Sequence, residues 1–158
     1  MKNILLITLL MTLGTVSIQA ANLTKMEEAT LYVEKELKTN FYPQKVSHGN
    51  IVGLRAFESY WSKEVFIITK YEIDLDLVKG SNSLLTKEEY RKFHNDFKYE
   101  FRKVQIKQVC SNDQLRKLLS KGIVARNTFL WTNIKDNVTT SPVIRTNVGN
   151  ATCIENGF

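Results

Sequence analysis

Two cysteines and two histidines are the side chains of this sequence best suited to nucleophilic, redox or metal chemistry. Cys110 and Cys153 are far apart, so the Cys-x-x-Cys spacing of redox enzymes is absent. Two thiolates with no nearby histidine supply only half of the four ligands that a structural zinc ion requires. We therefore predict no redox pair, no metal site and no cofactor.

The histidines, His48 and His94, do not belong to a recognisable catalytic motif. A serine or cysteine nucleophile needs a histidine that a third group orients, and no such grouping lies near either position. His48 adjoins Gly49 in an expected loop. His94 lies near Asp96 in an expected helix, and we interpret it as a surface or boundary residue. The sequence thus predicts no catalytic residue; a small hydrolase that combines either histidine with distant carboxylates is the alternative.

Three carboxylates alternate along one segment of the chain, at Glu72, Asp74 and Asp76. This spacing places them on one face of a β-strand, where they could meet a cation or a basic partner. Calcium loops use a turning backbone with glycine rather than an extended strand. We therefore expect a solvated sheet face, with lysines or arginines of neighbouring strands opposite the carboxylates.

The N-terminal segment has the composition of a cleavable export signal. Lys2 precedes an apolar run with no charged residue before Lys25, and small residues follow the run near Ala20. Its dense apolar part is about half as long as the roughly 20 residues that span a bilayer. We predict a signal peptide over residues 1–20 and one mature domain over residues 21–158 without a membrane span; an uncleaved anchor is the alternative.

Export also decides how the two cysteines are interpreted. Secreted and periplasmic proteins fold under oxidising conditions, in which an isolated pair of cysteines forms a disulfide. We therefore predict a structural disulfide between Cys110 and Cys153.

Three helix starts carry the same capping pattern, a serine or threonine followed three residues later by glutamate or glutamine. They begin at Thr24, Thr86 and Ser111. The first helix is expected to end near Asn40, and Gly122 is expected to end the third. The apolar residues at helical spacing are interpreted as core: Met26, Thr30, Val33 and Leu37 in the first helix; Tyr90, Phe93, Phe97, Phe101 and Val104 in the second; Leu115, Leu118 and Leu119 in the third.

Alternating apolar and polar residues predict strands on both sides of the second and third helices. Residues 65–77 form the longest strand, and residues 51–57 pair with it across a turn near residues 62–63. Residues 123–132 and 138–148 form a second hairpin around residues 135–137. The order α-β-β-α-α-β-β predicts an α+β fold, an antiparallel sheet of about four strands in two hairpins with helices packed on one face.

Positive charge is concentrated on the predicted helices. Residues 86–122 contain ten lysines and arginines against five aspartates and glutamates, whereas the rest of the mature chain is balanced. We expect a basic helical face opposite a partly acidic sheet face, and such a field steers a protein toward acidic partners or an anionic surface. The candidate interaction face comprises Arg91, Lys92, Lys98, Arg102, Lys103, Lys107, Arg116 and Lys117.

A pattern of cysteine, asparagine and leucine marks the C-terminal third of the chain. From residue 110 the sequence follows Cys-x-Asn-x-x-Leu-Arg-x-Leu-Leu-x-x-Gly, and an aromatic strand, a polar turn, another strand and Cys153 come after it. This arrangement resembles small exported proteins of Gram-negative bacteria that share the pattern and the closing cysteine. The resemblance covers roughly residues 85–153 and implies a periplasmic location and the disulfide, but no activity. The turn at residues 133–137 departs from the group because it lacks a glycine.

An export signal without a catalytic set favours a binding role. We predict a non-enzymatic periplasmic or secreted binding or accessory protein whose partner is a protein of the cell envelope, in the assembly of a surface or secretion apparatus. Nucleic acid is not expected, because exposed aromatics interleaved with the basic residues and a known binding motif are missing. An inhibitor or immunity-type protein that blocks another protein is a second alternative beside the hydrolase.

Overall fold

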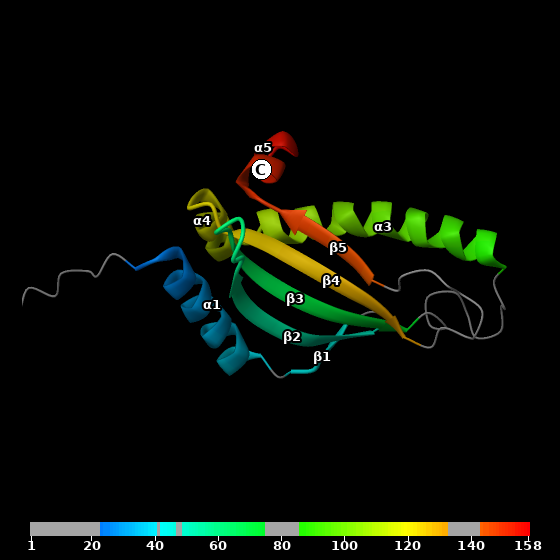
Figure 1. Cartoon of the computed structure of the whole chain (residues 1–158), viewed down its shortest axis with the longest axis horizontal. Helices are drawn as coiled ribbons and strands as arrows, with labels where there is room; N and C mark the ends of the chain where they lie inside the picture. Colours follow the sequence, from blue (N-terminus) through cyan, green and yellow to red (C-terminus); the bar gives the residue numbers. More distant parts are fainter. Residues whose placement is uncertain (1–22, 41, 47–48, 75–85, 133–142) are drawn as a thin grey trace, which may run out of the picture.

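A computed structural model describes residues 23–40, 42–46, 49–74, 86–132 and 143–158 (Figure 1). The predicted signal peptide, His48, Asp76 and the predicted turn at residues 135–137 lie outside the described residues. The elements follow the order α1 (Lys25–Thr39), β1 (Gln44–Val46), β2 (Gly49–Glu58), β3 (Val65–Asp74), α3 (Lys87–Cys110), α4 (Asp113–Ser120), β4 (Val124–Thr132), β5 (Val143–Val148) and α5 (Asn150–Glu155).

Two of the three predicted helix caps are confirmed. Thr24 and Thr86 each form a full capping box with the glutamate three residues later. The third prediction was wrong, because α3 continues through Cys110 and leaves Ser111 in a helical backbone conformation. Asn112 is the first extended residue, and its side chain accepts the hydrogen bond from the backbone of Leu115 at 2.9 Å.

The sheet has five strands in the spatial order β1-β2-β3-β4-β5. Both predicted hairpins are present, since β2 pairs with β3 and β4 pairs with β5 in antiparallel fashion. The predicted antiparallel sheet of four strands was nevertheless wrong, because β3 and β4 run parallel. In the sequence, the 24-residue helix α3 follows β3 and precedes β4. At 1.5 Å per residue it spans about 36 Å. It returns the chain to the end at which β3 began, as in a β-α-β crossover.

Two elements of the structure were absent from the predicted order. β1 has three residues, too few for a periodic signal, and it pairs with β2 at the edge of the sheet. α5 has six residues, and its N-cap, Gly149, offers no side chain to mark the start of a helix. Neither element carries the sequence pattern on which the prediction relied.

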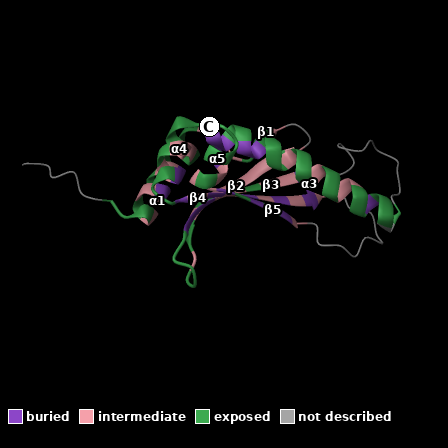
Figure 2. Cartoon of the chain, turned by 90° about the horizontal axis from the view of Figure 1, so that it is seen from above, coloured by how far each residue is buried: buried purple, intermediate pink, exposed green. Residues whose placement is uncertain are grey.

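All four described helices lie on one face of the sheet (Figure 2). α1 contacts β2 and β3, whereas α3 contacts β5 and α4 contacts β4. The buried core lies between these layers, and the aromatic stripe of α3 packs on it as predicted, through Tyr90, Phe93, Phe97 and Phe101. The opposite face of the sheet is uncovered by any described helix.

The inward faces of α1 and α3 end differently from the prediction. Val104 is 49% exposed, and the next inward residue of α3 is Gln105, which is 2% exposed. On α1, Leu37 is exposed, and the half-buried Glu36 lies toward the interior instead. The apolar periodicity was extrapolated one step too far on both helices, since polar residues occupy the inward positions there.

Candidate functional site

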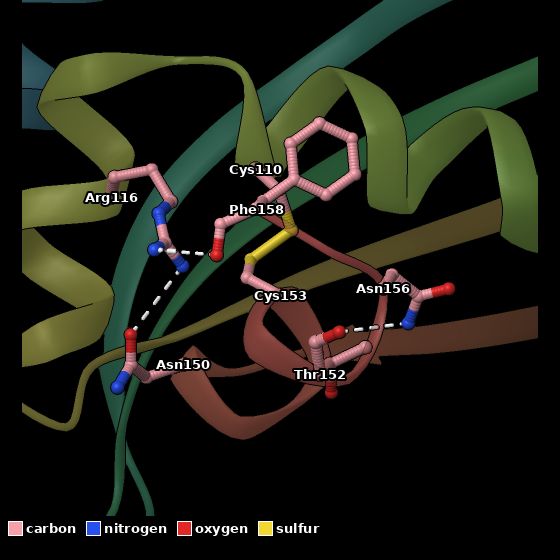
Figure 3. The surroundings of a disulfide bond; sticks show 7 residues. All are labelled: Cys110, Arg116, Asn150, Thr152, Cys153, Asn156 and Phe158. Carbon is pink, nitrogen blue, oxygen red and sulfur yellow. Dashed lines mark hydrogen bonds between the residues drawn. A yellow bond between two sulfur atoms is a disulfide. The ribbon is translucent and has the colours of Figure 1, made fainter.

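The disulfide ties the end of α3 to α5 at the C-terminal corner of the molecule (Figure 3). The Cα atoms of Cys110 and Cys153 are 5.5 Å apart, and both residues are buried. Arg116 of α4 adds polar contacts there, because its guanidinium donates to the backbone carbonyl of Phe158 at 3.1 Å and to the side chain of Asn150 at 3.5 Å. The last strand is thus followed by a segment that is anchored to two helices.

The eight basic residues predicted as an interaction face do not form one uniform surface. Seven of them are exposed along α3 and α4, but Arg116 is half-buried and engaged by the C-terminus. Lys103 pairs with Glu100 at 3.3 Å, and its ammonium lies 4.2 Å from the ring centroid of Tyr99. Part of the helical charge is therefore neutralised locally, and the helical face stays a prediction.

His94 is half-buried, and its surroundings do not resemble those of a catalytic base. Trp131 donates its indole N–H to Nδ1 of His94 at 3.3 Å. Burial, with a contribution from the positive charge of Lys98, lowers the pKa of His94. The nitrogen that an orienting carboxylate would contact in a catalytic triad is thus already occupied. Within the described ranges, no three histidine, cysteine or acidic residues gather as a metal site would require.

The uncovered sheet face is basic over its middle, and the expected acidic character is confined to the end of β3, where Glu72 and Asp74 lie on the same face. A hollow of about 550 Å³ lies there, lined by four cationic side chains together with Phe57 and Ile68. The cations come from four different strands: Arg55 from β2, Lys70 from β3, Arg126 from β4 and Arg145 from β5. Glu72 pairs with Lys70 at 3.3 Å on the same strand. The lysine or arginine expected opposite Glu72 on a neighbouring strand is not found among the described residues, because Asn50 and Leu130 occupy the paired positions.

The three arginines of this face are held outward by the sheet register. Ile68 pairs with Arg55 on one side and with Arg126 on the other, so both arginines share its face of the sheet. Arg145 pairs with Thr128, which lies two residues after Arg126, and therefore joins the same face. The guanidinium of Arg126 lies 3.9 Å from the ring centroid of Phe66 and donates through Nε to Asn147 at 2.9 Å. Among the described residues, no ion pair involves Arg55, Arg126 or Arg145. Applying the strand alternation to β2, β4 and β5 would have placed these arginines outward, although not side by side.

A turn with two exposed aromatic residues projects beside this face. Tyr60 and Trp61, in the connection between β2 and β3, are 75% and 90% exposed. Their rings meet edge to face, with centroids 5.2 Å apart, and the ammonium of Lys63 lies 5.0 Å from the centroid of Tyr60. Figure 2 shows the turn extending from the sheet on the side away from the helices. The turn was predicted from the sequence, but the exposure of its two aromatic residues was not.

A second hollow, of about 340 Å³, opens on the helical side between α1 and α3. Its lining combines amide and hydroxyl side chains, including those of Gln105, Asn127 and Tyr71, with apolar residues of the sheet. Burial raises the pKa of Tyr71, although a hydrogen bond with Gln105 opposes the shift. Burial also raises the pKa of Tyr32 on the wall formed by α1. Both phenols therefore remain neutral hydrogen-bonding groups at ordinary pH.

In the part of the chain that the structure describes, no helix is both long and apolar enough to traverse a lipid bilayer.

Comparison with solved structures shows a shared fold in one case and weaker likeness in two others. A protein of Pseudomonas aeruginosa described as secreted superposes with a TM-score of 0.54 at 17% sequence identity, covering 83% of this chain and 97% of that chain. The type 2 secretion system pilotin EpsS from Vibrio vulnificus gives 0.47 at 14% identity, covering 82% and 94%. The type II secretion system pilotin AspS from Vibrio cholerae gives 0.42 at 17% identity, covering 82% and 95%. No family model and no curated protein matches the chain.

Proposed function

We propose that the protein is a non-enzymatic, exported accessory protein that binds an acidic segment of a protein in the cell envelope through the uncovered sheet face. One observation carries this proposal: Arg55, Arg126 and Arg145 share a solvent-facing hollow and have no ion pair among the described residues. Cations that the fold itself does not neutralise favour an acidic partner by charge complementarity.

The apolar part of the same surface supports a protein partner rather than a small anion. Phe57 and Ile68 line the hollow between the cations, and Phe66 lies under the guanidinium of Arg126. The turn between β2 and β3, which projects beside this surface (Figure 2), carries the exposed Tyr60 and Trp61. Tryptophan, tyrosine and arginine are the residue types that most often dominate binding energy at protein interfaces. The combination suits an amphipathic segment that presents carboxylates beside apolar side chains.

The neutral pairing of His94 with Trp131 supports a role without catalysis. In a catalytic triad a carboxylate would contact Nδ1 of the histidine. In this protein the indole of Trp131 already occupies Nδ1 of His94. The hydrolase alternative would require a different nucleophile and base.

Site-specific crosslinking in cells that produce the full chain tests the proposal. A photo-reactive amino acid is placed at Trp61 or at Phe57 on the proposed face, and at Lys92 or Lys117 on the helices. We expect the first pair to capture one envelope protein, with the crosslinked segment rich in aspartate or glutamate. If that protein is a subunit of a surface or secretion apparatus, the experiment also identifies the assembly process in which this protein takes part.

Charge reversal supplies the matched control. Arg126→Glu with Arg145→Glu is compared with Arg91→Glu and Lys92→Glu on α3, which change the net charge equally. We expect the sheet-face pair to abolish the Trp61 crosslink and the α3 pair to leave it, with the melting temperature of each variant showing that it is folded. Loss of the crosslink only in the α3 pair, or capture only from Lys92 and Lys117, would assign binding to the helical face instead.

A further inference from the structure

We propose that the hollow between α1 and α3 is a binding site for an uncharged, hydroxyl-rich ligand of the mono- or disaccharide class. This site lies on the helical side of the sheet and is separate from the proposed protein-binding face. Its volume of about 340 Å³ is at the lower end of the range of small-molecule pockets, roughly 300–1,000 Å³.

Asn127 is the strongest indication of a ligand. It lies on β4, faces the helices, lines the hollow and is 3% exposed. Its side-chain Nδ2 group is buried and has no hydrogen-bond partner among the described residues. Burying an amide donor without a partner is costly, and nearly all buried polar groups in folded proteins are paired. A ligand oxygen in the hollow would supply the missing acceptor.

A second buried amide is oriented toward the same space. Gln105 of α3 is 2% exposed and lines the hollow, and it donates through Nε2 to Oε1 of Gln108 at 3.2 Å. This contact orients the amide before any ligand arrives. The polar residues Gln105 and Glu36 occupy the inward positions where the helical pattern predicted apolar ones. Departures from the expected pattern are typical of functional sites.

The charges of the lining exclude an anionic ligand. It contains no lysine, arginine or histidine, and its one carboxylate, that of Glu36, accepts a hydrogen bond from Asn40 at 2.9 Å. The raised pKa values of Tyr32 and Tyr71 keep both hydroxyl groups uncharged. Neutral hydroxyls and amides both donate and accept hydrogen bonds, which matches the hydroxyl groups of a sugar.

A peptide main chain fits this site less well. Peptides that are bound through their backbone usually extend a free sheet edge. Most of the floor of the hollow is formed by β2, β3 and β4, and each of these strands is paired on both sides; only Gln44 comes from the edge strand β1. Recognition therefore relies mainly on side chains, which converge from three elements: Tyr32 on α1, Gln105 on α3 and Asn127 on β4.

Titration of the mature chain, followed by two-dimensional NMR of backbone and side-chain amides, tests this inference. The probes are glucose, N-acetylglucosamine, maltose and trehalose, with trialanine and inorganic phosphate as contrasting ligands. We expect at least one sugar to shift the side-chain amide signals of Asn127 and Gln105. Shifts with trialanine or phosphate alone, or no shift at these amides with any of the four sugars, would overturn the proposal.

Three variants separate binding from folding. Asn127→Leu removes the buried donor at similar volume, and Tyr32→Phe removes one wall hydroxyl; each is expected to weaken sugar binding at least tenfold. Thr146→Val is the control, because Thr146 is the cross-strand neighbour of Asn127 and also has a buried unpartnered hydroxyl, but it does not line the hollow. Unchanged sugar affinity in both Asn127→Leu and Tyr32→Phe, or an equal loss of affinity in Thr146→Val, would contradict the assignment. The partner crosslink from Trp61 is expected to persist in all three.

Discussion

Trp131 donates its indole N–H to Nδ1 of His94 across the interface between β4 and α3, over 3.3 Å. This contact requires Nδ1 to be an acceptor, and burial together with the charge of Lys98 lowers the pKa of His94. The unfolded chain takes up a proton on this residue near its usual pKa of about 6.5, before the folded protein does. We therefore expect the free energy of unfolding to fall as the pH drops below about 6.5, until His94 is protonated in the folded state as well.

Urea unfolding of the wild type and of His94→Gln across this pH range measures the effect. Glutamine can accept the indole hydrogen bond but does not titrate, so the stability of the variant should depend less on pH than that of the wild type. Equal pH dependence in the two proteins would show that His94 does not contribute to it.

The disulfide is expected to contribute a large share of stability. Cys110 and Cys153 are 43 residues apart in sequence, and closing a loop of this length contributes roughly 4 kcal/mol in the chain-entropy model. Replacing both cysteines by alanine should lower the free energy of unfolding by about that amount in denaturant titrations. Reductant should destabilise the wild type and leave the double variant unchanged, and any equal response of the two proteins would contradict the prediction.

The cap of α4 offers a matched pair of adjacent residues. The side chain of Asn112 accepts from the backbone of Leu115, whereas Ser111 belongs to the end of α3. Asn112→Ala should lower the free energy of unfolding by about 1 kcal/mol, and Ser111→Ala should change it by less than about 0.5 kcal/mol. Thermal and urea unfolding of both variants measures the contrast. The reverse order would restore Ser111 as the cap.

Local signals in the sequence predicted most elements of this fold, while relations between elements were harder to predict. The capping boxes at Thr24 and Thr86 and the alternation along β3 depend on neighbours within a few residues, and these predictions are confirmed. The parallel pairing of β3 with β4 depends on the direction in which α3 returns the chain, which no local pattern encodes. Alternation along each strand could have placed Arg55, Arg126 and Arg145 outward, but only the strand register shows that they lie side by side.

The two errors on the helices have a shared physical origin. Apolar periodicity predicts which residues are buried in a dry core, but α1 and α3 border a hollow lined by amides and hydroxyls. Gln105 is therefore buried where Val104 was expected, and Glu36 faces inward where Leu37 was expected. Hydrophobic periodicity alone could not have located the candidate ligand site. The polar residues that interrupt this periodicity in the structure do mark its position.

Replacing Asn127 is expected to raise the free energy of unfolding, whereas most substitutions in a core lower it. Large changes in a core usually destabilise, but Asn127→Leu replaces a buried donor that has no partner among the described residues. Removing such a group should raise the free energy of unfolding of the ligand-free protein by about 1–3 kcal/mol. Urea unfolding without added sugar measures it, and Ala29→Leu, at a fully buried position of α1 that does not line the hollow, serves as the overpacking control that should destabilise. A loss of stability in Asn127→Leu as large as in Ala29→Leu would mean that the amide is paired within the fold. The buried amide would then give no reason to expect a ligand.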